Sequence, residues 1–254
     1  MAITIKSERE IELMAEAGKI LERVHNELEK ALHPGMSTKD IDTLGEKIIR
    51  SYGCIPSFLN YNGYPASICV SVNQEVVHGI PDKHRIIHEG DIVSLDAGVI
   101  YKGDHSDAAR THAVGEVSEE AKKLIQVTKE CFFEGIKYAK AGNHLFDISG
   151  AIGRYAEERG YGVVRDLCGH GIGTALHEAP EIPNYEVGRK GVKLRPGMTL
   201  AIEPMINIGT YEVDWLDDDW TVVTRDGSLS AHYENTILIT EGEPRILSLT
   251  CDNE

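Results

Sequence analysis

The sequence lacks the features that would place it in a membrane or on a nucleic acid. No stretch approaches the roughly 18 uninterrupted apolar residues of a membrane-spanning helix. Basic residues are in the minority, 26 against 41 acidic residues, and the net charge of −15 disfavours a broad phosphate-binding surface. The opening residues, Met-Ala-Ile-Thr-Ile-Lys, lack the charged head and apolar run of a signal peptide. We therefore expect a cytoplasmic protein that binds neither membranes nor nucleic acids.

Cysteine is also scarce and scattered along the chain. The five cysteines are an odd number and form no C-x-x-C pair, so neither a disulfide framework nor a thiolate zinc site is indicated. We expect these side chains to be reduced and mostly buried. They are Cys54, Cys69, Cys131, Cys168 and Cys251.

What the sequence does contain is enough apolar material for a sizeable core, in a repeated order of elements. At 254 residues and 41% apolar content, it fits one large domain or two fused smaller ones. Capping residues and helical spacing predict a long helix after Ser7 and a second helix that ends before Gly53. β-Branched runs then predict strands at 67–72, 92–101 and 108–114. From Val117 the order begins again, with helices to about residue 138 and around 148–158.

The second set of elements follows the first at a constant distance. Gly35 and Gly142 are 107 residues apart, and the same offset aligns residues 90–96 with residues 197–203. This alignment twice places a carboxylate six residues after a glycine, at the end of a mostly apolar strand. We interpret the pattern as a duplicated half-domain.

The register breaks after the second of these strands. His105-Ser-Asp107 has its nearest counterpart in His232-Tyr-Glu234, 127 residues later, which implies about 20 inserted residues around 209–229. No linker rich in proline, serine or glycine separates the copies, so we expect one compact catalytic domain over residues 1–254 with a cleft between its halves. The halves would be about residues 1–115 and 116–254.

Acidic residues occur at corresponding strand ends in both copies. Asp96 and Glu203 directly follow apolar runs, and Asp107 and Glu234 add one carboxylate each in the following strands. Acidic side chains are seldom fully buried without a partner, and no lysine or arginine repeats beside these four. Four carboxylates that meet in one cleft therefore predict bound cations.

A histidine is the fifth candidate ligand. His170 lies in Cys-Gly-His-Gly-Ile-Gly, where glycines let the backbone approach another group closely. A dinucleotide loop is disfavoured, because Pro180 and Pro183 follow too soon for its phosphate-binding helix. Carboxylates and one imidazole suit first-row divalent metals, and pairs of such ions serve hydrolysis in phosphatases, nucleases and aminopeptidases. The residues alone do not separate these enzyme classes.

Several longer motifs are more specific than these single residues. They are Tyr61-Asn-Gly-Tyr-Pro, Val76-Val-His78-Gly-Ile-Pro, Asp96 and Asp107 eleven apart, Gly169-His170-Gly-Ile-Gly, His177-Glu-Ala-Pro, Ile202-Glu203-Pro-Met and Tyr233-Glu234-Asn-Thr. In order and spacing they resemble the bacterial-type, type I methionine aminopeptidases, over nearly the whole chain. The resemblance implies the α+β pita-bread (creatinase/aminopeptidase-like) fold, two pseudo-symmetric halves with a central antiparallel β-sheet and helices outside.

The resemblance also implies a reaction and the residues that perform it. The activity would be removal of the initiator methionine from nascent proteins and peptides whose second residue is small, by a hydroxide that two metals activate. Glu203 would move the proton, while His78 and His177 would hydrogen-bond the scissile peptide. The five implied metal ligands, of which Asp107 and Glu234 bridge both ions, are Asp96, Asp107, His170, Glu203 and Glu234.

Further implied groups complete the site. Mn, Fe, Co and Zn all tolerate such ligands, so the sequence does not identify the metal. A monovalent cation, Na or K, would lie near Asn73, Glu75 and Ser230. The implied methionine pocket is lined by Phe58, Tyr61, Tyr64, Cys69, His78, Leu176, His177 and Trp220. Phe58, Asn62 and Leu176 depart from some well-known bacterial members, which affects the shape of the pocket and leaves the metal ligands intact.

Two other activities remain open on the sequence. One is a proline-directed aminopeptidase or dipeptidase of the same fold, although such relatives usually carry an additional amino-terminal domain. The other is a non-catalytic member that binds peptides in the same cleft, although such proteins have lost metal ligands. The implied partners are peptide and nascent-protein amino termini, with transient contact to the ribosome, and the family shape implies a monomer.

Overall fold

The helices begin where the capping residues predict. In the computed structural model, which describes residues 3–249, Ser7 caps α1 (Glu8–Ala31) and Ser37 caps α2 (Thr38–Ser51). In both caps the serine accepts a hydrogen bond from the third helical residue, whose carboxylate accepts one from the backbone N–H of the serine. The second half supplies α3 (Glu119–Ile136) and α4 (Leu145–Glu157). None of these helices, within residues 3–249, is long and apolar enough to cross a membrane.

The strands of residues 3–249 pair antiparallel in four sheets. The first half contributes β1 (Ile55–Pro56), β2 (Ile68–Val72), β3 (Glu75–Val77), β4 (Ile92–Tyr101) and β5 (Asp104–Ala113), with a short 3-10 helix at Tyr61–Gly63. The second half contributes β6 (Gly162–Val163), β7 (Gly169–Gly171), β8 (Glu178–Ile182), β9 (Thr199–Ile202), β10 (Met205–Asn207), β11 (Val213–Trp215), β12 (Val222–Thr224), β13 (Ser230–His232), β14 (Asn235–Leu238) and β15 (Arg245–Ile246).

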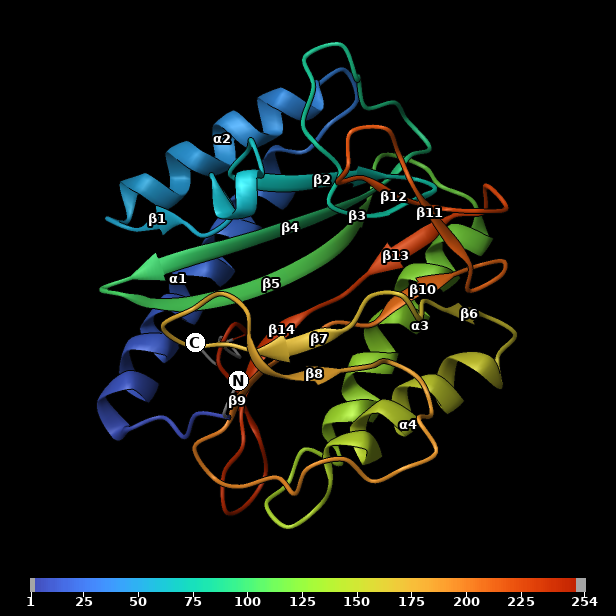
Figure 1. Ribbon diagram of the computed structural model, residues 1–254. Coiled ribbons are helices and arrows are strands. Elements are labelled where there is room, and N and C mark those ends of the chain that lie inside the picture. The colour runs from blue at the N-terminus through green and yellow to red at the C-terminus, as the bar shows by residue number, and fades with distance from the viewer. Residues whose placement is uncertain (1–2, 250–254) are drawn as a thin grey trace.

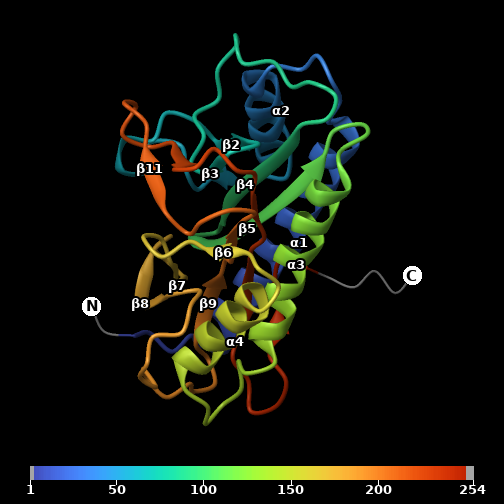
Figure 2. The same ribbon diagram turned by 90° about the vertical axis from the view of Figure 1, so that its right-hand side faces the viewer.

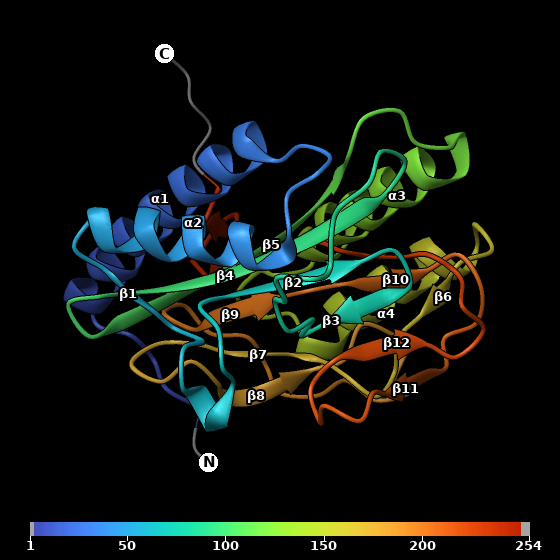
Figure 3. The ribbon, with the colours of Figure 1, turned by 90° about the horizontal axis from the view of Figure 1, so that it is seen from above.

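Two of these sheets carry the candidate site. In the first half the order is β1-β4-β2, in which β1 and β2 pair with different parts of β4 while β5 pairs with β4 over its whole length. In the second half the order is β15-β14-β9-β7-β8. The smaller sheets are β13-β10-β6 and β11-β12-β3, and the latter joins the two halves. Helices α1 and α3 lie on the same side of β4 and β5 (Figure 2 and Figure 3).

Each half has its own apolar core. One core packs α1 and α2 against β2 and β4, with Leu21, Ile41 and Leu95 fully buried. The other packs α3 and α4 against β9 and β10, around Phe132 and Ile148. Burial of these helix faces holds the helices outside and the strands inside (Figure 1). The predicted α+β class, with antiparallel strands covered by helices, is confirmed.

Local geometry repeats at the offset that the sequence shows. Gly35 and Gly142 both have a φ of 94°, which favours glycine. The isolated bridge between Ser37 and Ile86 recurs 107 residues later between His144 and Lys193. These features support two pseudo-symmetric halves, while the division near residue 115 stays a prediction.

Some boundaries differ from those predicted. Strand β5 begins at Asp104 and not at residue 108, because the turn of the β4–β5 hairpin is made by Lys102 and Gly103, both with positive φ. Pairing with β4 therefore holds residues 104–107 in a strand, although these polar residues have low β-propensity. The segment predicted as an insertion, 209–229, forms the β11–β12 hairpin on β3.

The cysteines agree with the expectation where they are described. Cys54, Cys69 and Cys131 are free and buried, and Cys168 is free and half-buried. Cys251 lies outside the described residues.

Candidate metal centre and substrate pocket

Strand register places the two carboxylates of the first half on one face of the sheet. Asp96 of β4 is opposite Ala109 of β5, and Asp107 of β5 is opposite Gly98 of β4. Directly paired residues share a face and side chains alternate along a strand, so Asp96 and Asp107 are diagonal neighbours on the same face. Gly98 provides no side chain there.

The second half places its ligand-type residues by the same logic. Ile202 of β9 pairs with Asn235 of β14, so the next residues along, Glu203 and Glu234, lie opposite each other. His170 of β7 pairs with Ala201 of β9, two residues before Glu203 and therefore on its face.

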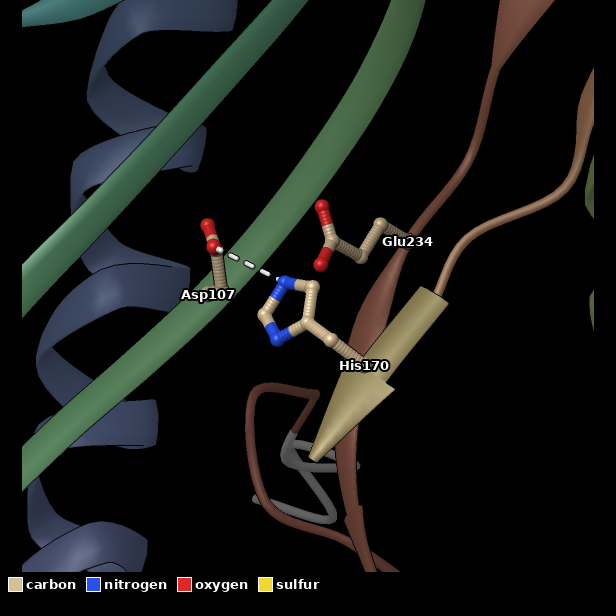
Figure 4. Close-up of side chains that lie close together, drawn as sticks. All are labelled: Asp107, His170 and Glu234. Atoms are coloured by element: carbon tan, nitrogen blue, oxygen red, sulfur yellow. Dashed lines mark ion pairs between the residues drawn. The ribbon is translucent and has the colours of Figure 1, made fainter. Parts of the chain in front are cut away.

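Hydrogen bonds between the halves bring the two pairs together. The Glu234 N–H donates to the Ala109 carbonyl at 3.0 Å, and the Asp107 N–H donates to Thr236 Oγ1 at 2.9 Å. Strand β5 thus runs beside the segment that carries Glu234. Figure 4 shows Asp107, His170 and Glu234 pointing toward one another from these separate segments.

The distances are those of a metal-binding group. One ligand atom from each of Asp107, His170 and Glu234 lies within 4.8 Å of the others. His170 Nε2 is also 3.6 Å from Glu203 Oε1, and Asp96 lines the same pocket. The five residues predicted as ligands are therefore brought together in space.

The carboxylates are buried without neutralising partners. Asp96 Oδ1, Asp107 Oδ1 and Glu234 Oε1 are inaccessible to solvent and have no hydrogen-bond partner among the described residues. Burial raises the pKa of Asp96 to about 7, and burial together with the neighbouring carboxylates raises the pKa values of Asp107, Glu203 and Glu234 well above the usual range. The nearby Arg110 lowers the pKa of Glu234, but its effect is smaller than that of burial. Such orphaned oxygens fit divalent cations.

The orientation of His170 supports the same conclusion. Its Nδ1 lies 2.9 Å from the Gly171 carbonyl, which can only accept, so Nδ1 carries the hydrogen. Burial lowers the pKa of His170 to about 3, so the ring is neutral and Nε2 presents a lone pair. That lone pair faces Glu203 and Asp107 at 3.6 and 4.0 Å. A lone pair that faces carboxylates is favourable when a cation lies between them.

The glycines around His170 are required by neighbouring strands. A Cβ at Gly169 would overlap the Ala201 carbonyl oxygen, and a Cβ at Gly171 would overlap that of Ala179. The close approach that the motif predicts is therefore to protein backbone on both sides of His170. Tight packing on both sides fixes the position of the imidazole.

The buried carboxylates predict how pH and metal affect stability. A folded-state pKa above the unfolded value means that these carboxyl groups bind more protons in the metal-free folded protein than in the unfolded chain. Their contribution to stability is therefore fully present below about pH 4 and is lost as the pH rises through the folded values, about 7 for Asp96. Metal replaces these protons, so Mn²⁺ should raise the Tm more at pH 7.5 than at pH 5.5. Differential scanning fluorimetry with and without Mn²⁺ measures this, and equal Tm shifts at both pH values would contradict it.

The pocket that ends at these carboxylates has a volume of about 290 Å³ and an apolar wall. Tyr64, Cys69 and Leu176 are buried in one cluster, against which Trp220 packs. The Tyr64 and Trp220 rings meet edge to face with centroids 5.1 Å apart, and the Tyr64 hydroxyl donates to the Gly79 carbonyl at 3.0 Å. The residues predicted for substrate binding all line this pocket: Phe58, Tyr61, Tyr64, Cys69, His78, Leu176, His177 and Trp220.

Two histidines lie beside the carboxylates in this pocket. His78 follows β3 with a φ of 60°, a conformation that is uncommon outside glycine and that clusters at functional sites. Burial lowers its pKa to about 4, so the ring is neutral near pH 7. His177 Nδ1 is 2.7 Å from the Tyr61 hydroxyl, and its ring centroid is 4.2 Å from that of His170.

Sequence reasoning missed part of the site. Five further residues line the pocket: Val77, Asp166, Leu167, Cys168 and Met205. Val77, Cys168 and Met205 lie inside quoted motifs, and Asp166 and Leu167 lie within three residues of Gly169. Adjacency to those motifs is the signal that could have found them. The same signal applies to His232, which directly precedes the Tyr233-Glu234 motif and lies near Glu203 and Glu234, but in the sequence it served only to align the two halves.

The residues named for a monovalent cation lie close together. The Ser230 N–H donates to the Asn73 carbonyl at 2.9 Å, and the Glu75 carboxylate pairs with Arg85. A cation there stays a prediction.

Comparison with known proteins gives consistent matches. The model of metallopeptidase family M24 matches residues 12–241. A methionine aminopeptidase from Clostridium acetobutylicum is 58% identical over 97% of this chain and 99% of its own. A crystal structure of a methionine aminopeptidase from Thermotoga maritima superimposes with a TM-score of 0.96 at 47% identity, covering 98% of this chain and 100% of the other.

A second group of structural neighbours is longer and less similar. An Xaa-Pro dipeptidase from Bacillus anthracis has a TM-score of 0.77 at 27% identity, and covers 97% of this chain and 62% of its own. The pita-bread fold is common to both groups. Sequence identity is much higher with the methionine aminopeptidases.

Proposed function

The chain belongs to metallopeptidase family M24, and from that premise we propose that it removes the amino-terminal methionine from peptides and nascent proteins whose second residue is small. Relatives 40–58% identical over nearly the whole chain carry the name methionine aminopeptidase. The observation that carries the proposal is a pocket with orphaned carboxylates at one end and an apolar wall beside them. Such a pocket fits an uncharged side chain next to a bond that metals activate.

The metal centre is the first element of the proposal. Asp96, Asp107, His170, Glu203 and Glu234 would hold two divalent ions, and Asp107 and Glu234 would be shared by both. When bound, the ions would supply Lewis-acid activation of a water molecule and of the scissile carbonyl. Mn, Fe, Co and Zn all suit carboxylate and imidazole ligands.

The protein groups around the metal centre would transfer protons and orient the substrate peptide. Burial and the charge of Asp96 raise the pKa of Glu203, which suits a carboxylate that accepts a proton from water and returns it to the leaving amine. With the Tyr61 hydroxyl donating to Nδ1 of His177, the Nε2 of that ring keeps its hydrogen and can donate to the peptide. His78 would contact the same peptide from the other side of the pocket.

The apolar wall would select methionine. A flexible thioether packs well against aromatic rings and other polarizable groups, and Tyr64, Cys69 and Trp220 supply such a surface. The limited volume of about 290 Å³ favours one side chain and a small neighbour. Cytoplasmic location, ribosome contact and a monomeric state stay predictions.

Substrate preference tests this function. We expect purified protein with Mn²⁺ to release methionine from a Met-Ala-Ser peptide but not from Met-Lys-Ser, since the second residue must fit beside the metal centre. Free methionine is measured by amino-acid analysis. An Ala-Pro-Ser peptide tests the proline-directed alternative, and addition of EDTA should abolish turnover. Preference for the proline peptide, or activity that survives chelation, would contradict the proposal.

A further inference from the structure

A buried histidine without a hydrogen-bond partner lies behind the candidate metal centre. His232, the last residue of β13, is 2% exposed. Neither of its ring nitrogens has a hydrogen-bond partner among the described residues. Burying an unsatisfied polar group is unfavourable, which points to a partner that the described protein atoms do not supply in this arrangement.

The ring is aimed at two of the candidate ligands. His232 Nε2 is 3.8 Å from Glu203 Oε2 and 4.0 Å from Glu234 Oε2. These separations are too long for hydrogen bonds, yet a shift of about 1 Å would make either one. His170 approaches the other oxygen of Glu203, Oε1, at 3.6 Å. The imidazoles of His170 and His232 therefore each face a different oxygen of the Glu203 carboxylate.

The backbone of His232 is fixed by β5. Its N–H donates to Thr111 Oγ1 at 2.9 Å, and the Thr111 hydroxyl donates to its carbonyl at 2.9 Å. Its Cα is also paired with Met205 of β10. The backbone from which the imidazole extends is thus held in place beside the carboxylates.

The ring lines a different cavity from the one that Glu203 and Glu234 line. It does not line the substrate pocket, but it does line a rear cavity of about 360 Å³ between α1 and α3, together with His25 and Arg110. Water in that cavity can satisfy Nδ1. A residue in this place cannot touch substrate, so any part it has in the reaction is through the metal ligands.

We propose that the Nε2–H of His232 donates to the Glu203 and Glu234 carboxylates when they bind metal, and that it fixes their orientation as a positioning residue. The inference rests on the proposed function, because the carboxylates have this role if metal binds. Partners of this kind hold ligands in the required direction, and their loss typically weakens metal binding by about 10- to 100-fold.

Isothermal titration calorimetry with Mn²⁺ tests the proposal on the wild type, His232→Asn and His232→Gln. The glutamine amide nitrogen reaches the position of Nε2, whereas that of asparagine reaches the position of Nδ1. We expect a Kd about 10- to 100-fold higher for His232→Asn and a nearly unchanged Kd for His232→Gln. His25→Asn is the control, because His25 is also buried but bonds to the Ala108 carbonyl, and it should leave the Kd unchanged.

The outcomes separate this inference from the proposed function. If the wild type binds no Mn²⁺, the proposed function fails and this inference with it. If the wild type binds and His232→Asn binds equally tightly, the role of His232 alone is overturned. The metal-free Tm of His232→Asn should stay close to that of the wild type, and a large drop would show a structural role instead.

Discussion

Replacing Glu203 with glutamine is expected to lower kcat by about 10²- to 10⁴-fold, the usual contribution of a group that transfers protons in the transition state. Glutamine preserves the size of the side chain and one oxygen, but it cannot accept a proton at neutral pH. The neighbouring His170 keeps its hydrogen bond to the Gly171 carbonyl, so the imidazole stays in place. KM should change little, because the apolar wall is formed by other residues. Initial rates on a Met-Ala-Ser peptide at saturating Mn²⁺ measure both constants.

A matched control separates proton transfer from general effects of lost charge. Glu241 is exposed and lies outside the pocket, so Glu241→Gln should retain wild-type kcat. Metal binding by Glu203→Gln should be measured in parallel, so that kcat is compared at full occupancy. A variant that binds Mn²⁺ and turns over at the wild-type rate would exclude Glu203 as the proton carrier.

The sequence predicted the positions of the ligand-type residues well for a physical reason. Duplication places Asp96 and Glu203 at equivalent positions of the two copies, and buried carboxylates from two copies require a shared neutralising group. The expectation that both residues lie at strand ends is correct for Glu203, which follows β9, and wrong for Asp96, which lies within β4 because pairing with β5 extends that strand to Tyr101. The structure brings these side chains together with Asp107, Glu234 and His170. Their roles as ligands stay a proposal.

Other features depend on contacts that a single sequence does not display. The start of β5 at Asp104 follows from pairing with β4, which outweighs the weak strand propensity of its polar residues. Glycine is required at Gly169 and Gly171 because the carbonyl oxygens of Ala201 and Ala179 on neighbouring strands leave no room for a Cβ. His232 reads as an ordinary strand residue until its unsatisfied nitrogens are seen beside Glu203.

Replacing Asp107 with asparagine should lower turnover without lowering the stability of the metal-free protein. Turnover is expected to fall by several orders of magnitude, because a ligand proposed to be shared by both ions loses its charge. Stability of the metal-free protein at pH 7.5 should be unchanged or higher, since Asp107 Oδ1 has no partner to lose and burial already raises its pKa. The backbone bond to Thr236 Oγ1 is unaffected by the change. Peptide turnover, Mn²⁺ calorimetry and metal-free Tm together measure this.

Asp104→Asn is the matched control for that experiment. Asp104 lies on the same strand, is also buried with an unpartnered Oδ1, and is outside the pocket. It should therefore keep wild-type Mn²⁺ affinity and turnover. If Asp107→Asn instead lowers the metal-free Tm by several degrees and leaves Mn²⁺ affinity intact, Asp107 is a structural residue. Burial of the Asp107 carboxyl group costs free energy in the metal-free protein, and a bound ion would offset that cost. An unchanged or higher metal-free Tm with weaker Mn²⁺ binding in Asp107→Asn, and unchanged Mn²⁺ binding in Asp104→Asn, is the result expected from this.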